Sequence, residues 1–161
     1  VVVSFSGGKD STICLELTIE AARQAGKLPV HCVMRDEEIM FPGTFEYCER
    51  VAKRKDEIDF HWLVANQPIV NIFDRKNPYF WVFDPLVPKE KWVRQPPSYA
   101  EYIDEKHIGA LVGKDRFPTA DDKILYVVTG LRVQESPNRR MGLFSSKNLI
   151  LDVKSTMLFF T

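Results

Sequence analysis

The chain has 161 residues, enough for one domain with a buried core. Its 22 basic and 22 acidic residues cancel, so bulk positive charge is not available to attract nucleic acid. An anionic ligand would need a local cluster of polar groups. The sequence has no apolar run of membrane-spanning length, and its cysteines, Cys14, Cys32 and Cys48, are expected to be buried free thiols in a reducing, cytoplasmic compartment.

The first part of the chain alternates apolar strands with amphipathic helices. Strands are predicted at Val1–Phe5, Val30–Met34 and Phe60–Val64. Between them, one helix is expected to be capped by Asp10 or Ser11 and the next by Thr44. This βαβαβ order predicts an α/β fold of the Rossmann-like type, an open parallel sheet with helices on both faces.

Residues 66–123 break this alternation. The segment contains seven of the ten prolines and nine aromatic residues, so we predict an ordered insertion with short helices, the clearest at Ser98–His107. Further strands are expected at Lys123–Gly130 and Asn148–Val153. We interpret residues 1–161 as a single domain, with residues 66–123 as an insertion within it. Because the chain begins inside a strand without Met and stops inside an apolar segment, we expect flanking sequence to be missing.

The stretch SGGKDS, Ser6 to Ser11, follows the first strand and precedes the first helix. Glycines let the backbone approach a ligand closely, and the N–H groups and dipole of a helix N-terminus favour an anion. Serine hydroxyls and Lys9 add donors and positive charge. Asp10 could cap the helix, order the loop or hold a cation. A plain Gly-Gly turn explains SGG alone, but the strand–loop–helix setting favours phosphate binding.

The spacing fits neither a Walker A loop nor GxGxxG. SGGKDS instead resembles the PP-loop, SGGxDS, of the adenine nucleotide α-hydrolase-like superfamily, which includes ATP pyrophosphatases and phosphoadenosine-phosphosulfate (PAPS) reductases. The resemblance implies that this loop holds the phosphates of an adenine nucleotide, ATP or PAPS. The nucleotide-binding residues that it indicates at this end of the chain are Ser4, Ser6, Gly7, Gly8, Lys9, Asp10 and Ser11.

A second motif narrows the resemblance. GLRVQESPNRR, after the strand that ends at Gly130, is similar to the G-x-R-x-x-E/Q-S-x-x-R segment of the PAPS reductase family. By position, its nucleotide-binding residues would be Gly130, Arg132, Glu135, Ser136 and Arg139. Arginines suit forked contacts to phosphate or sulfate oxygens. Lys9 and Arg132 are the candidate catalytic residues because both could stabilise developing phosphate charge.

A third segment, RDEEIMFPGT, resembles the acidic stretch that follows the second strand in this family. Asp36 matches the family's acid and is a candidate for contacting ribose or a metal, as is Glu37; a solvated acidic turn explains the segment equally well. The insertion around Trp92, Arg94 and Pro97 resembles a Trp/Pro-rich segment of phage- and plasmid-borne members. Base stacking is conceivable there, but structural packing is the favoured interpretation.

The resemblance leaves the reaction open. True PAPS reductases carry a nucleophilic cysteine in a C-terminal tail, and neither that tail nor the paired cysteines of an iron–sulfur member is present. The hypotheses are therefore a sulfonucleotide reductase, an enzyme of ATP pyrophosphatase or adenylylation type in sulfur metabolism, a sulfur-transfer component of a DNA phosphorothioation system, and a catalytically inactive nucleotide-binding regulator.

The implied cofactors and partners follow from these hypotheses. The cofactor is an adenine nucleotide, with Mg²⁺ as an assisting ion and Asp10 as its candidate ligand; the residues do not support an iron–sulfur cluster. A thiol electron donor or a sulfur carrier is the expected partner, and a homodimer is compatible with the family. His31, His61 and His107 have no acid or cysteine at a ligand spacing in the sequence and are interpreted as structural.

Overall fold

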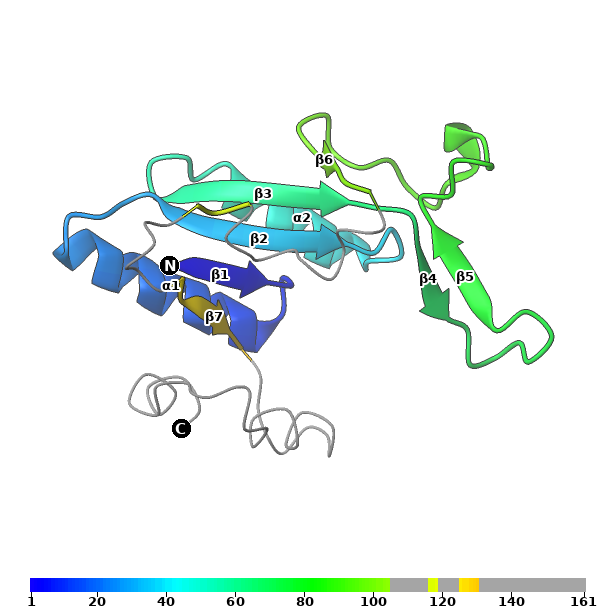
Figure 1. Cartoon of the computed structure of the whole chain (residues 1–161), viewed down its shortest axis with the longest axis horizontal. Coiled ribbons are helices and arrows are strands. Elements are labelled where there is room, and N and C mark those ends of the chain that lie inside the picture. The colour runs from blue at the N-terminus through cyan, green and yellow to red at the C-terminus, as the bar shows by residue number, and fades with distance from the viewer. Residues whose placement is uncertain (105–115, 119–124, 131–161) are drawn as a thin grey trace.

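The computed structural model describes residues 1–104, 116–118 and 125–130, and its centre is a parallel sheet (Figure 1). The strand order is β6-β3-β2-β1-β7, and each neighbouring pair is parallel. The strands span Val2–Phe5 (β1), Val30–Asp36 (β2), Ile58–Val64 (β3), Glu101–Tyr102 (β6) and Val127–Thr129 (β7). The predicted α/β fold with an open parallel sheet is confirmed.

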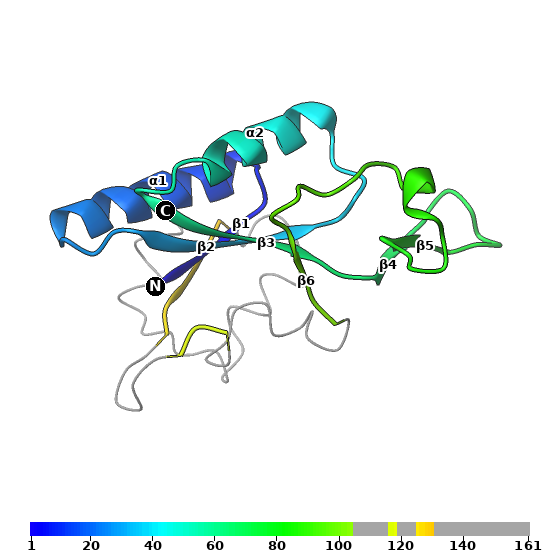
Figure 2. The same ribbon diagram turned by 90° about the horizontal axis from the view of Figure 1, so that it is seen from above.

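Two helices connect the first three strands. α1 (Lys9–Gln24) joins β1 to β2, and α2 (Pro42–Ala52) joins β2 to β3. Both connections step across the sheet in the same direction, so right-handed crossovers place both helices over the same face (Figure 2). Between that face and the helices lies the main core, which includes Phe5, Leu15 and Trp62. The opposite face carries a smaller cluster.

Both predicted helix caps are wrong. Gly8 is the N-cap of α1 and Phe41 is the N-cap of α2, and neither end has a side-chain cap hydrogen bond. α1 starts at Lys9, before the predicted capping residues. α2 starts at Pro42, whose fixed φ suits the first turn of a helix and whose missing N–H costs nothing there.

The insertion after β3 begins with a hairpin rather than a helix. β4 (Gln67–Val70) and β5 (Tyr79–Val82) pair antiparallel and project beyond the carboxyl end of β3 (Figure 1). The 3₁₀ turn η1 (Lys89–Lys91) follows. The predicted helix at Ser98–His107 is wrong over its described part, because β6 pairs with the end of β3 there.

Two predictions for the remainder have different outcomes. The predicted strand at Lys123–Gly130 is confirmed as β7, which pairs with β1, although it is shorter. The predicted strand at Asn148–Val153 lies outside the described residues. Among the described residues, no helix has the length and apolar character to cross a membrane.

Candidate functional site

The loop between β1 and α1 is held in shape by two glycines. Gly7 has φ of +73°, a left-handed conformation that glycine adopts without strain. A Cβ at this position would lie 2.7 Å from the Cys48 sulfur and 2.8 Å from Cγ2 of Thr44, so α2 packs directly against the loop. Gly8 is the N-cap of α1, which begins at Lys9. No side-chain cap hydrogen bond closes this end of α1, and a helix N-terminus is a favourable position for an anion.

Serine and threonine hydroxyls order the same loop. The Ser11 hydroxyl donates to the Gly8 carbonyl oxygen at 2.9 Å and accepts from the Ser6 amide at 3.3 Å. The Ser6 and Ser11 hydroxyl oxygens are 3.1 Å apart, and the Gly8 amide donates to the Ser6 hydroxyl at 3.4 Å. Thr12 also donates to the Gly8 carbonyl, at 2.9 Å. Ser11 is buried, and its hydrogen bonds hold the backbone of Ser6 and Gly8 in place. Ser6 is exposed.

Lys9 and Asp10 lie at the first turn of α1. The Lys9 ammonium is 3.8 Å from a carboxylate oxygen of Asp10. The Lys9 side chain is 76% exposed, so it can reach a ligand over the loop, and Asp10 is 28% exposed. A lysine of this kind is a mobile point charge suited to phosphate oxygens.

The end of β7 lies against the start of α1. A Cβ on Gly130 would lie 2.7 Å from both the Asp10 carbonyl carbon and the Ser11 nitrogen. Only a residue without a side chain permits this approach of two backbones. The structure therefore brings Gly130, from the second predicted motif, next to the SGGKDS loop.

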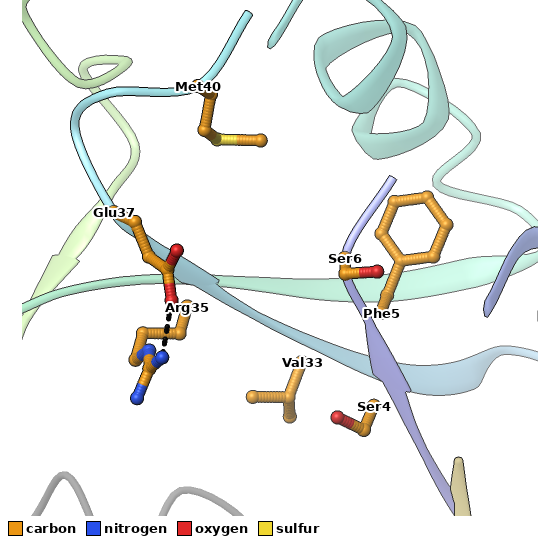
Figure 3. A pocket seen from close by; sticks show the side chains of 7 residues that line it. All are labelled: Ser4, Phe5, Ser6, Val33, Arg35, Glu37 and Met40. Atoms are coloured by element: carbon orange, nitrogen blue, oxygen red, sulfur yellow. Dashed lines mark hydrogen bonds and ion pairs between the residues drawn. The ribbon is translucent and has the colours of Figure 1, made fainter. Parts of the chain in front are cut away.

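A pocket of about 270 Å³ opens beside this loop, at the carboxyl ends of β1 and β2 (Figure 3). This is the edge of an open parallel sheet where ligands bind. Arg35 and Glu37 form an ion pair on one side of it. Arg35 was not predicted; it follows Val33 by two residues, so strand alternation puts both on the face of Ser4. The lining residues are Ser4, Phe5, Ser6, Val33, Arg35, Glu37 and Met40.

Asp36 ends β2 and has no exposed surface. One carboxylate oxygen accepts from the Glu38 amide at 2.8 Å and pairs with Arg94, and the other accepts from the Trp62 indole N–H at 2.7 Å. Both oxygens are thus engaged by the protein, so a direct contact to ribose or a metal is not available to Asp36 in this structure. Its neighbour Glu37 is the acid that faces the pocket.

Glu38 has a structural role in this turn that the sequence alone did not indicate. It is 2% exposed and has φ of +60°, an uncommon value for a residue with a side chain. Its carboxylate accepts from the Phe83 amide and, at 2.6 Å, from the Val93 amide. A buried acid that binds two distant amides ties the insertion to the end of β2.

The favoured interpretation of the insertion, structural packing, is confirmed for Trp92 and Arg94. The Trp92 ring packs edge-on against Phe83 with centroids 5.3 Å apart, and its indole N–H donates to the Asp84 carbonyl. The Arg94 guanidinium lies 4.1 Å from the centroid of Phe45 while it pairs with Asp36.

All three cysteines are buried and none forms a disulfide, as predicted. Burial raises the pKa of Cys32 far above its usual range and, with a smaller contribution from Asp36, raises the pKa of Cys48 to about 11. Burial also raises the pKa of Cys14, and Asp10 adds to the effect. These thiols stay protonated at neutral pH, so none fits the part of a reactive nucleophile.

Four predicted site residues lie outside the described part of the chain. Nothing in the structure therefore tests their proposed contacts. They are Arg132, Glu135, Ser136 and Arg139.

Comparison with known protein families gives a match over the first part of the chain. Residues 1–79 match the model of the phosphoadenosine phosphosulfate reductase domain. Residues 1–79, just under half of the chain, are thus similar to that family, which is the family that the motifs within them predicted. The match spans β1 through the beginning of β5, including the SGGKDS loop and the acidic turn.

One curated relative is similar over a longer segment. Over 102 residues, 62% of this chain, it is 36% identical to "Uncharacterized protein YbdN" of Escherichia coli (strain K12). The aligned segment covers only 24% of that protein, so this chain corresponds to about a quarter of the relative's length. No solved structure matches the chain.

Proposed function

We propose that this chain binds an adenine nucleotide, ATP or PAPS. The phosphate or sulfate groups of the nucleotide would lie at the N-terminus of α1, and its nucleoside would lie toward the pocket between β1 and β2. The observation that carries the proposal is the loop itself. Gly7 and Gly8 lead into a helix end without a side-chain cap hydrogen bond, Ser6 is exposed in the same loop, and the Lys9 side chain is exposed at the first turn. Polar pocket residues lie next to the same loop.

We propose that the segment after β7 forms the side of the phosphate site that faces the SGGKDS loop. Gly130 contacts the backbone of Asp10 and Ser11 so closely that no larger residue fits. We propose that Arg132 and Arg139 contact the phosphate or sulfate oxygens opposite Lys9. Mg²⁺, with Asp10 as a ligand, would neutralise part of the phosphate charge.

The family includes enzymes, and we propose that this chain takes part in catalysis at the nucleotide. Reduction of an activated sulfate needs a reactive thiol, and the three buried cysteines do not supply one. Attack of water or an acceptor oxygen on the α-phosphorus, with pyrophosphate as the leaving group, needs no thiol, and Lys9 is proposed to stabilise the developing phosphate charge. This observation favours the ATP reaction for the chain itself; the PAPS reaction would require a thiol from a partner or from another part of the protein.

A ligand screen by thermal unfolding tests the binding proposal. The ligands are ATP, PAPS, adenosine 3′,5′-bisphosphate and adenosine, each with and without Mg²⁺. A ligand present at one hundred times its dissociation constant stabilises the folded state by about 2.7 kcal/mol. We expect stabilisation by the charged nucleotides; a folded protein that none of them stabilises would refute the proposal.

Replacement of Arg132 tests whether the segment after β7 contacts the charged end of the nucleotide. Arg132→Ala is expected to weaken ATP or PAPS much more than adenosine, because the guanidinium contacts only the charged end. The matched control is Lys27→Ala, which removes an exposed cation after α1 and away from the loop. Equal losses for adenosine and the nucleotide would show that Arg132 does not recognise the phosphate end. Release of pyrophosphate from ATP then separates an enzyme from a binding protein.

A further inference from the structure

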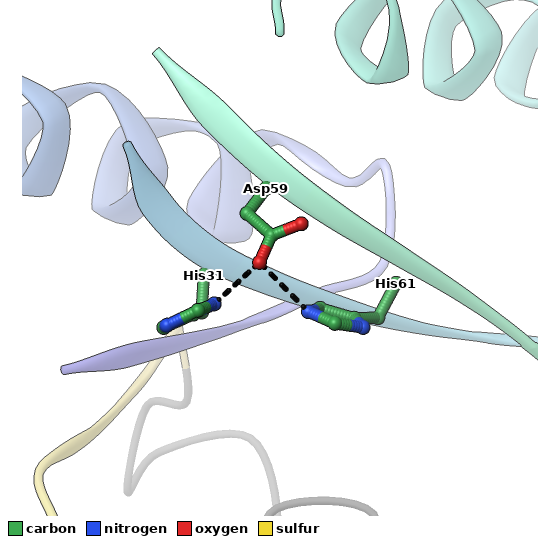
Figure 4. A group of neighbouring side chains, drawn as sticks. All are labelled: His31, Asp59 and His61. Carbon is green, nitrogen blue, oxygen red and sulfur yellow. Dashed lines mark hydrogen bonds and ion pairs between the residues drawn. The ribbon is translucent and has the colours of Figure 1, made fainter. Parts of the chain in front are cut away.

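A cluster of two histidines and one aspartate lies on the sheet face opposite α1 and α2 (Figure 4). His31 is on β2 and its register partner in β3 is Asp59. His61 follows Asp59 by two residues, so strand alternation places it on the same face. The spacing in sequence conceals this cluster, since His31 and Asp59 are 28 residues apart and meet only through the pairing of β2 with β3.

The possible metal-ligand atoms of the three side chains lie close to one another. One carboxylate oxygen of Asp59 is 2.8 Å from Nδ1 of His31 and 3.3 Å from Nε2 of His61. One ligand atom from each residue lies within 4.8 Å of the other two. Zinc binds imidazole nitrogen and carboxylate oxygen at about 2.0–2.2 Å, which separates tetrahedral ligand atoms by about 3.3 Å. The separations of 2.8 and 3.3 Å from the Asp59 oxygen are close to this value, so an ion could sit between the three atoms after modest side-chain movement.

The surroundings of His61 favour a ligand role. Its second nitrogen, Nδ1, is 2.8 Å from a carboxylate oxygen of Glu101 on β6, and Arg116 donates to the other Glu101 oxygen at 2.6 Å. A carboxylate bound to the remote nitrogen is the usual partner of a metal-binding histidine, because it fixes the tautomer and directs the other nitrogen to the ion. The ring of Phe117 packs against both imidazoles, with centroids 5.1 Å from each.

The cluster is also accessible to an ion from solvent. The side chains of His31 and Asp59 are 45% and 46% exposed, and that of His61 is 20% exposed. The cluster does not include a residue that lines the pocket beside the SGGKDS loop. It lies toward the amino ends of the strands, whereas the pocket lies at their carboxyl ends.

We propose that His31, Asp59 and His61 form a binding site for a divalent transition-metal ion, with zinc as the best-fitting ion. Nδ1 of His31, Nε2 of His61 and a carboxylate oxygen of Asp59 are the ligands, and water fills the open position. Two nitrogens and one oxygen suit zinc better than Mg²⁺, which prefers oxygen ligands alone. The ion joins β2 to β3 directly and holds β6 through Glu101.

Zinc affinity measured by competition with a chromophoric chelator tests the proposal. The protein is metal-free and carries no histidine tag. The wild-type chain is expected to bind one equivalent, and His61→Ala or Asp59→Asn to lower the affinity at least about 100-fold. Glu101→Gln, which keeps all three ligands, is expected to lower it about 10–100-fold. Asp56→Asn, an exposed carboxylate just before β3, is the matched control and should leave the affinity unchanged.

Two measurements on the wild-type chain keep the test independent of variant folding. Zinc should shift the ring signals of His31 and His61 in NMR spectra. Cobalt bound in place of zinc should lack the intense near-ultraviolet band of thiolate ligation, because the site contains no cysteine. The proposal is overturned by failure to bind one equivalent, by equal affinity in Asp59→Asn and Asp56→Asn, by unshifted signals of these histidines, or by a thiolate band.

Discussion

The loop after β1 and the acidic turn after β2 lie at the same edge of the sheet, but their polar groups are used differently. In the loop, Ser6 and Lys9 are exposed and no side chain caps α1. In the turn, Asp36 and Glu38 are buried and bind Arg94 and backbone amides of the insertion. Polar residues at neighbouring strand ends are thus exposed in one case and used to hold the fold together in the other.

Replacement of Asp36 should have the largest effect on stability. Asp36→Asn leaves the partly buried guanidinium of Arg94 without its carboxylate, and removal of one partner from a buried ion pair costs about 3–5 kcal/mol. We expect the free energy of unfolding to fall by about 3 kcal/mol in urea titrations. Glu37→Gln, at the half-exposed neighbouring position, should change stability by less than about 1 kcal/mol. Equal effects of the two changes would contradict the structural role of Asp36.

Alanine at Gly130 tests the close contact between β7 and α1. A Cβ there would clash with the backbone of Asp10 and Ser11, so we expect a loss of about 1–3 kcal/mol of stability and weaker nucleotide binding. Gly43→Ala is a matched control within α2, where a Cβ meets no atom within 4 Å. The control should stabilise the protein by about 0.5–1 kcal/mol, through higher helix propensity. If Gly130→Ala and Gly43→Ala shifted the thermal unfolding temperature in the same direction, the proposed clash at Gly130 would be contradicted.

Lys9→Ala should affect ligand binding without affecting stability. The side chain is 76% exposed, and we expect a roughly tenfold loss of affinity for ATP or PAPS, about 1.4 kcal/mol, in calorimetric titrations. The loss should shrink at high salt because exposed charges are screened. An unchanged affinity would remove Lys9 from the phosphate site. Lys27→Ala again serves as the control.

The smallest expected effect is in the labelling of the cysteine thiols of the native protein as the pH is raised. A raised pKa keeps a thiol protonated until the pH approaches the new value, so Cys48, with a pKa of about 11, should remain unreactive between pH 7 and pH 9 in the native state. Cys14 and Cys32, whose pKa values are also raised by burial, should behave alike. All three should react once the chain is unfolded. Rapid labelling of the native protein would restore a thiol-based reaction as a possibility.

Local patterns in the sequence were sufficient for the central elements. The apolar run before SGGKDS predicts β1, which is present. The spacing of Cys14 and Leu17 predicts a helix, and α1 is present, although Leu17 is 58% exposed and Leu15 lies on the buried face with Cys14 instead. The expected helix at Ser98–His107 failed because Glu101 pairs with Leu63 of β3, and such long-range pairing overrides local preference.

The parts of the site that sequence reasoning missed depend on distant contacts. Glu38 owes its role to Val93, 55 residues away, and to a positive φ that its residue type does not indicate. The histidine cluster depends on the register of β2 against β3. The glycine loop could be predicted because its glycines, hydroxyls and lysine are contiguous.

Backbone NMR with inorganic pyrophosphate tests the difference between the two segments most directly. We predict that the amide signals of Gly8, Lys9 and Asp10 move on titration, because an anion binds at the start of α1. Those of Glu37 and Glu38 should stay in place. Shifts centred on the acidic turn, or none at the loop, would contradict the assignment of the SGGKDS loop as the phosphate site.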